Sequence, residues 1–256
     1  MLTGILIISV VIFIAVVSYR RPRLEQRVIK QIPVIDWLIM FVFPILCYIG
    51  LVLVIRSILL RQRVTMLDFD DIQLIGVGGI FMIYLFVGTS VHFVSKVLSR
   101  YINKTKDAKI YQINELFHGK LSHYIVYVCG FMVAFLLAIL EINYPMPEKL
   151  PNLTVVLITA LGMTAGFSSF KSIFYTNASF GGYNKPFFLI SIVLLSILSS
   201  IYRTQKLPIA FYPMNIFISG SLFSLISIFI IRQFLIFSKL SKKNRMRFIA
   251  RLFSTS

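Results

Sequence analysis

The sequence predicts an all-α integral membrane protein, a polytopic bundle of seven transmembrane helices. Of the 256 residues, 58% are hydrophobic and only 14% are charged, and the mean hydropathy is +0.87. A soluble domain of this size could not bury so much apolar surface. Seven apolar stretches each come close to the length of about 20 residues that crosses a bilayer. The predicted spans are Leu2–Tyr19, Val34–Ile55, Ile72–Val94, Tyr124–Leu140, Leu153–Phe170, Pro186–Ile201 and Ile209–Ile231.

The basic residues fall mainly in every second gap between these stretches, and this pattern predicts the orientation of the chain. Twenty of the 26 Lys and Arg residues lie in Arg20–Lys30, in Lys96–Lys120, in Lys171–Lys185 and in the tail from Arg232. Short segments rich in Lys and Arg stay in the cytoplasm. We therefore expect an outside N-terminus, a cytoplasmic C-terminus and a bacterial plasma membrane. We also expect the first span to be retained as an anchor.

The chain divides into a seven-helix domain, residues 1–236, and a basic tail, residues 237–256. The tail mixes basic and apolar residues at helical spacing, which is typical of an amphipathic helix on the inner leaflet that contacts anionic lipid headgroups. A disordered tail that only fixes the topology is the alternative. The net charge of +17 does not indicate nucleic-acid binding, because the charges are dispersed over membrane-flanking loops. The sequence does not set the oligomeric state.

Small residues mark places where helices can approach closely. They are Gly76, Gly78 and Gly79 in the third span and Gly162-x-x-x-Gly166 in the fifth. Close backbone contact is one of the few sources of pairing energy between helices in lipid. The pattern favours tight packing inside one bundle over a homodimer contact or a broken transporter helix.

Carboxylates precede the third span on the predicted outer side. Asp68, Asp70 and Asp71 share this loop with Arg61 and Arg63. Carboxylates at a helix N-terminus accept free backbone amides and interact well with the helix dipole. We predict capping and local ion pairing here, and a cation entry site is the alternative.

All three histidines lie near one predicted cytoplasmic connection. His118 and His123 flank the start of the fourth span, and His92 lies near the cytoplasmic end of the third. Neutral imidazoles bind zinc, iron or manganese, and a bound metal turns water into a nucleophile. We predict that His92, His118 and His123 are metal ligands and that Glu115 is a further ligand or a general base.

The spacing of these residues limits the metal hypothesis. His118 and His123 are five residues apart and would diverge by about 140° on one continuous α-helix. They converge if the helix breaks at Gly119. The alternative is that the histidines and Ser122 cap the fourth span and bond to lipid headgroups or loop carbonyls. Haem ligation is a third interpretation.

Two further residues are candidate substrate contacts. Ser122 lies between the two histidines of the fourth span, and Lys171 follows the fifth span, where it could contact an anionic group. A lysine at this position also serves simply to mark the membrane edge. Together these residues favour a metal-dependent, hydrolase-like membrane enzyme that acts on a lipid-like substrate at the cytoplasmic interface. The alternative is a noncatalytic transporter, channel or membrane-complex assembly subunit.

Overall fold

A computed structural model describes residues 1–18, 22–102, 107–176, 184–241 and 244–246. This part of the chain is mainly helical, with one hairpin of strands β1 (Val28–Ile29) and β2 (Ile32–Pro33). Besides α-helices it contains two π-helical segments, η1 and η2, and a 3₁₀ turn, η3. The helical elements are α1 (Leu2–Ser18), α2 (Pro22–Gln26), α3 (Val34–Trp37), η1 (Leu38–Val42), α4 (Phe43–Leu59), α5 (Asp71–Tyr101), α6 (Ala108–Glu115), η2 (Leu116–Ser122), α7 (His123–Ile142), α8 (Asn152–Thr176), α9 (Asn184–Thr204), η3 (Ile209–Phe211) and α10 (Pro213–Ser238).

Among the described residues, six helical segments are long and apolar enough to cross a membrane, which supports the predicted class of an integral membrane protein. Helix α1 is also apolar but has only 17 residues. A seventh crossing therefore stays a prediction, and so does the side of the membrane on which each terminus lies. The six segments are Val34–Leu59, Asp71–Tyr101, Ala108–Ile142, Asn152–Lys171, Lys185–Thr204 and Pro213–Ser238.

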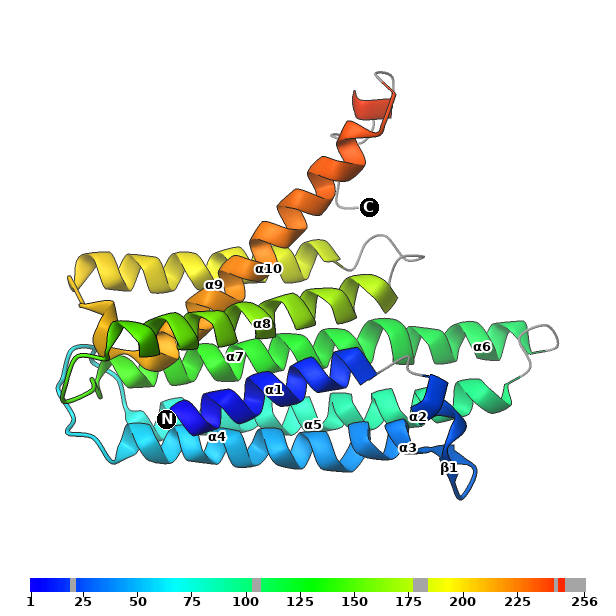
Figure 1. Ribbon diagram of the computed structural model, residues 1–256, viewed down its shortest axis with the longest axis horizontal. Coiled ribbons are helices and arrows are strands. Elements are labelled where there is room, and N and C mark those ends of the chain that lie inside the picture. Colours follow the sequence, from blue (N-terminus) through cyan, green and yellow to red (C-terminus); the bar gives the residue numbers. More distant parts are fainter. Residues whose placement is uncertain (19–21, 103–106, 177–183, 242–243, 247–256) are drawn as a thin grey trace.

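The long helices form a bundle in which most axes follow the long axis of the molecule. In Figure 1, α1, α4, α5, α7, α8 and α9 run in this direction, and α10 crosses them obliquely and projects beyond them. Helix α8 packs on α10, α5 on α7 and α1 on α4. We call one end of the bundle the His end, where His92, His118 and His123 lie, and the other the Glu141 end.

The fourth predicted span, Tyr124–Leu140, differs most from the structure. The helix begins at Ala108 and runs to Ile142. The expected break at Gly119 does not occur, because η2 joins α6 to α7 as a π-helix. A π-helix keeps the backbone hydrogen-bonded while it adds a residue to the turn. The chain therefore remains helical through the histidine segment.

The last span begins at Pro213, after the 3₁₀ turn η3. Proline is well suited to the first turn of a helix, because an amide at that position has no partner within the helix. Helix α10 ends at Ser238. Residues 242–243 and 247–256 lie outside the described residues, so the amphipathic tail helix stays a prediction.

Glycines bring α8 and α10 into direct backbone contact, as the spacing of Gly162 and Gly166 predicts. A Cβ atom on Gly162 would overlap the carbonyl of Phe217, and one on Gly166 would overlap the carbonyl of Ser221. The Ser221 hydroxyl donates to the Gly162 carbonyl at 2.9 Å. This geometry supports close packing within one bundle.

The glycines of the third span do not pack in this way. An added Cβ on Gly76 or Gly79 would meet no described atom within 4 Å, and one on Gly78 would only touch Leu136 at 4.0 Å. The expectation of tight packing is therefore wrong for this segment. On α5 the close approach is made instead by Gly88, which faces Ile125 of α7.

Replacing Gly166 with leucine should therefore destabilise the bundle by about 1–3 kcal/mol, because overpacking forces the two backbones apart. Unfolding of the purified protein in detergent measures this effect. Gly79→Leu is the matched control, since its side chain would enter open space. Equal losses of stability in the two variants would contradict the assigned α8–α10 contact.

A buried carboxylate organises the Glu141 end. Glu141 is completely buried and pairs with Arg61 at 2.9 Å. Its other oxygen accepts the backbone amides of Met214 at 2.7 Å and Asn215 at 3.1 Å. The side-chain carboxylate of α7 thus caps the N-terminus of α10, where the helix dipole favours negative charge. Through its ion pair with Arg61, Glu141 also holds the segment that follows α4.

Two of the three carboxylates at the start of α5, Asp70 and Asp71, cap and pair as predicted. Asp70 accepts the backbone amide of Ile72 at 2.8 Å. Asp71 pairs with Arg63 at 3.0 Å and accepts a hydrogen bond from the Tyr144 hydroxyl at 2.6 Å. That hydrogen bond raises the pKa of the Tyr144 phenol above its ordinary value. Both carboxylates are therefore engaged in structural contacts.

Candidate metal centre

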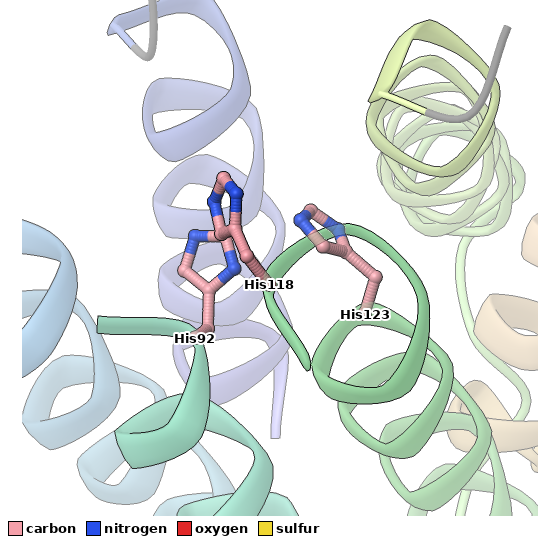
Figure 2. A group of neighbouring side chains, drawn as sticks. All are labelled: His92, His118 and His123. Carbon is pink, nitrogen blue, oxygen red and sulfur yellow. The ribbon is translucent and has the colours of Figure 1, made fainter. Parts of the chain in front are cut away.

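Three imidazole rings from two membrane helices converge at the His end. Figure 2 shows the rings of His92, His118 and His123 pointing toward one shared space. The ring centroids of His92 lie 4.7 Å from His118 and 4.6 Å from His123, and those of His118 and His123 are 6.1 Å apart. One nitrogen from each ring lies within 4.8 Å of the other two. The three histidines are close enough to bind one metal ion, as predicted.

The π-helix explains why His118 and His123 meet despite their spacing. On an α-helix these residues would diverge, but a π-helix bonds residue i to residue i+5 and so places residues five apart on nearly the same side. His118 lies within η2, and His123 is the first residue of α7. His92 reaches the same space from α5, which packs against both η2 and α7. Local backbone geometry therefore builds the cluster.

The rings lie in a protected and mainly apolar environment. His92 and His123 are 9% and 7% exposed, and the side chain of His118 is 12% exposed. The Nε2 atoms of His118 and His123 are buried without a hydrogen-bond partner among the described residues. A buried polar atom without a partner is costly. A cation bound between the rings would satisfy both lone pairs.

Neighbouring polar groups hold two of the rings in place. Glu115 Oε1 lies 3.8 Å from His118 Nδ1, one helical turn away. The Ser122 hydroxyl donates to the His118 carbonyl at 2.6 Å and lies 3.4 Å from His92 Nδ1. Glu115 thus contacts the side of His118 that faces away from the orphan nitrogen. Ser122 is the last residue of η2, and its hydroxyl contacts the backbone of His118 and the ring of His92.

Sequence analysis missed an ion-pair cluster next to the histidines. Asp36 of α3 is 1% exposed and pairs with Lys96 and with Arg100, the latter at 2.8 Å. His92, Lys96 and Arg100 recur every four residues and therefore share one face of α5. That polar stripe on an apolar helix could have indicated the cluster from the sequence. Buried cations require a carboxylate partner, so Lys96 and Arg100 predict an acidic residue nearby. The cluster anchors the helix that carries His92.

A cavity of about 560 Å³ adjoins the histidines inside the bundle. Its wall is formed by α1, η1, α4, α5, α7, α8 and α10, with Ser122 at the end of η2, and is mainly apolar. The predicted substrate contacts Ser122 and Lys171 both line it, together with His92 and His123. His92, Ser122, His123 and Lys171 therefore share one cavity, whereas His118 and Glu115 lie outside its lining.

Comparisons of this chain with protein-family models, with curated proteins and with solved structures found no match.

Proposed function

We propose that the protein is a metal-dependent membrane hydrolase in which His92, His118 and His123 hold one zinc ion that activates water against a lipid-like substrate. The observation that carries this proposal is the convergence of three buried imidazoles, two of them with an orphan Nε2 atom. Buried polar groups are normally paired. Two orphan nitrogens in a cluster of three converging imidazoles are therefore best explained as ligand atoms.

The spacing of the nitrogens is compatible with zinc. Zinc–nitrogen bonds of about 2.0–2.1 Å in a tetrahedral site place the ligand nitrogens about 3.3 Å apart. The candidate atoms lie within 4.8 Å of one another, so small rotations of the rings would bring them to bonding distance. Three protein ligands leave the fourth position for water or substrate, which is the pattern of a catalytic zinc site.

The ligand set favours zinc over the other metals considered. Manganese prefers carboxylate oxygens, and non-haem iron commonly takes two histidines and one carboxylate. Glu115 lies against Nδ1 of His118, which supports an orienting role outside the metal shell, because a carboxylate there fixes the ring and its tautomer. Haem fits less well, since axial histidines bind opposite faces of the macrocycle, whereas these rings face one another at 4.6–6.1 Å.

The proposal places the site at the cytoplasmic boundary of the membrane. The basic segments on either side of the His end belong to the set that the charge pattern assigns to the cytoplasm. Ester, amide or phosphate bonds of lipids lie near this depth. The basic tail would add contacts with anionic headgroups. In this proposal the membrane is a bacterial plasma membrane.

A noncatalytic transporter, channel or assembly subunit is the competing proposal. A transporter needs a polar route from the Glu141 end to the histidines. Asp70 and Asp71 are engaged in capping and ion pairing, and the cavity between the two ends has a mainly apolar wall. These contacts favour the enzyme.

Zinc binding and lipid hydrolysis test the proposal directly. Full-length protein stripped with a chelator should bind one zinc ion per chain in a competition titration. Acidification should release the ion, because the three imidazoles must be neutral to act as ligands. The zinc-loaded protein should hydrolyse ester or phosphoester lipids, and the stripped protein should not. Folded protein that binds neither zinc, iron nor manganese would refute the metal site, and metal binding without hydrolysis would refute the enzyme.

A further inference from the structure

The cavity beside the histidines has the dimensions of one acyl chain. Its lining on the helix that carries His123 runs from Ser122 to Ala134, which is about 18 Å of helix. Its volume is about 560 Å³. That volume lies within the range of about 300–1,000 Å³ that is typical of small-ligand pockets, and the length of the lining suits one extended hydrocarbon chain. A diacyl lipid would be too large to enter completely.

The lining changes in polarity from one end of the cavity to the other. The polar groups gather at the His end, where His92, Ser122, His123 and Lys171 line the space. Toward the Glu141 end the wall is apolar and includes Met82, Ala134 and Met214. This gradient matches an amphiphile whose polar end lies at the histidines and whose hydrocarbon chain extends into the bundle.

Two aromatic residues mark an entrance from the lipid phase. Tyr48 on α4 and Phe86 on α5 both line the cavity and are 51% and 39% exposed, more than the other residues of the lining. Their ring centroids are 6.5 Å apart. Residues that belong both to the lining and to the outer surface lie where the cavity meets the surroundings. The line between α4 and α5 is therefore the expected path for a hydrocarbon chain.

We infer that the cavity binds one acyl chain of an anionic amphiphile that enters between α4 and α5 and places its headgroup beside the histidines and Lys171. This inference rests on the proposed function for the idea that the bound lipid is the substrate. The binding itself depends only on the cavity and its polar end. The inference predicts that the site binds single-chain lipids and that Ala134 and Met214 limit the length of the chain.

Photolabelling with a sixteen-carbon fatty acid that carries a diazirine at its methyl end tests the position of the chain. Full-length protein in detergent is labelled, digested and analysed by mass spectrometry. The label should appear on the cavity walls of α7 and α10, near Ala134 and Met214. Label confined to outward-facing residues such as Val193, which is 54% exposed on α9, would overturn the inference.

Two size variants test the limit on chain length. Ala134→Phe should reduce labelling by the sixteen-carbon probe at least tenfold and should spare a ten-carbon probe, because it fills the deep part of the cavity. Leu136→Phe is the control, since Leu136 lies on the same helix but does not line the cavity. Equal effects of the two variants on the long probe would overturn the assignment.

The headgroup contact has its own test. Lys171→Gln should weaken binding of the fatty acid and of a single-chain phospholipid with an anionic phosphate by about tenfold, as expected for loss of one charged contact. Binding of an uncharged monoacylglycerol should not change. A similar loss for all three lipids would remove Lys171 from the inference, and comparison of the two anionic probes shows which headgroup fits better.

The acyl-chain site and the metal site can be refuted independently of each other. Every binding measurement is repeated on zinc-loaded and on chelator-stripped protein. Chain binding in a protein that takes up no metal would refute the proposed hydrolase and leave the lipid site intact. Stoichiometric zinc without label in the cavity would refute the lipid site and leave the metal site intact.

Discussion

The His92→Ala variant should lose stoichiometric zinc while it keeps its fold. His92 is the one ligand supplied by α5, so its removal leaves only the two histidines of the η2–α7 segment. Loss of an outer-shell partner alone costs 10–100-fold in metal affinity, and loss of a direct ligand should exceed that range. Metal content by elemental analysis and affinity by chelator competition measure the change.

Two companion variants make the result specific. His92→Cys retains a ligand that zinc accepts and should recover part of the affinity. Ser90→Ala alters the same helix at an exposed residue whose hydroxyl only bonds the Phe86 carbonyl, and it should bind zinc as the unmodified protein does. Full zinc occupancy in a folded His92→Ala protein would exclude the three-histidine site.

Glu141→Ala should destabilise the protein by about 3–5 kcal/mol, the cost of breaking a buried ion pair by removing one partner. The substitution leaves Arg61 buried without its carboxylate and removes the acceptor from two amides at the start of α10. Denaturant or thermal unfolding in detergent measures the effect. Zinc binding should be retained in the folded fraction, because the histidines lie at the other end of the bundle.

An exposed pair in the same region is the matched control. The side chain of Arg63 is 42% exposed in its pair with Asp71, so Arg63→Ala, which leaves the Tyr144–Asp71 hydrogen bond in place, should cost about 1 kcal/mol or less. Removing both members of the buried pair, with Arg61→Met and Glu141→Leu together, should recover part of the lost stability. Equal effects of Glu141→Ala and Arg63→Ala would contradict the assigned role of Glu141.

Much of the membrane architecture could be predicted from the sequence, because apolar length is a strong signal. Stretches that need to cross a bilayer stand out from hydropathy alone, and the Gly162 and Gly166 spacing correctly indicated a close contact. Helix α1 has only 17 residues, so a seventh membrane crossing stays a prediction. The orientation of the chain rests on the charge pattern and stays a prediction.

The site could be predicted in composition but not in geometry. The common depth of His92, His118 and His123 followed from their places at the ends of two consecutive spans. The convergence of the three rings could not be predicted, because it depends on a π-helix at Leu116–Ser122 that no residue pattern there indicates. The ion pairs of Asp36 and Glu141 join residues far apart in sequence, and a single sequence carries no information about which partners meet.

The π-helical turn makes the number of residues between the histidines as important as their identity. In a helix each residue advances the direction of its side chain by about 100°, and η2 contains the additional residue that brings His118 over His123. Insertion of one residue between His118 and His123 would place them six apart and swing one imidazole away from the other, whereas removal of one would leave them four apart, on one face of an ordinary α-helix. The binding chemistry of this bundle thus depends on the helical phase between the two histidines, and an insertion between them would be more damaging than most substitutions there.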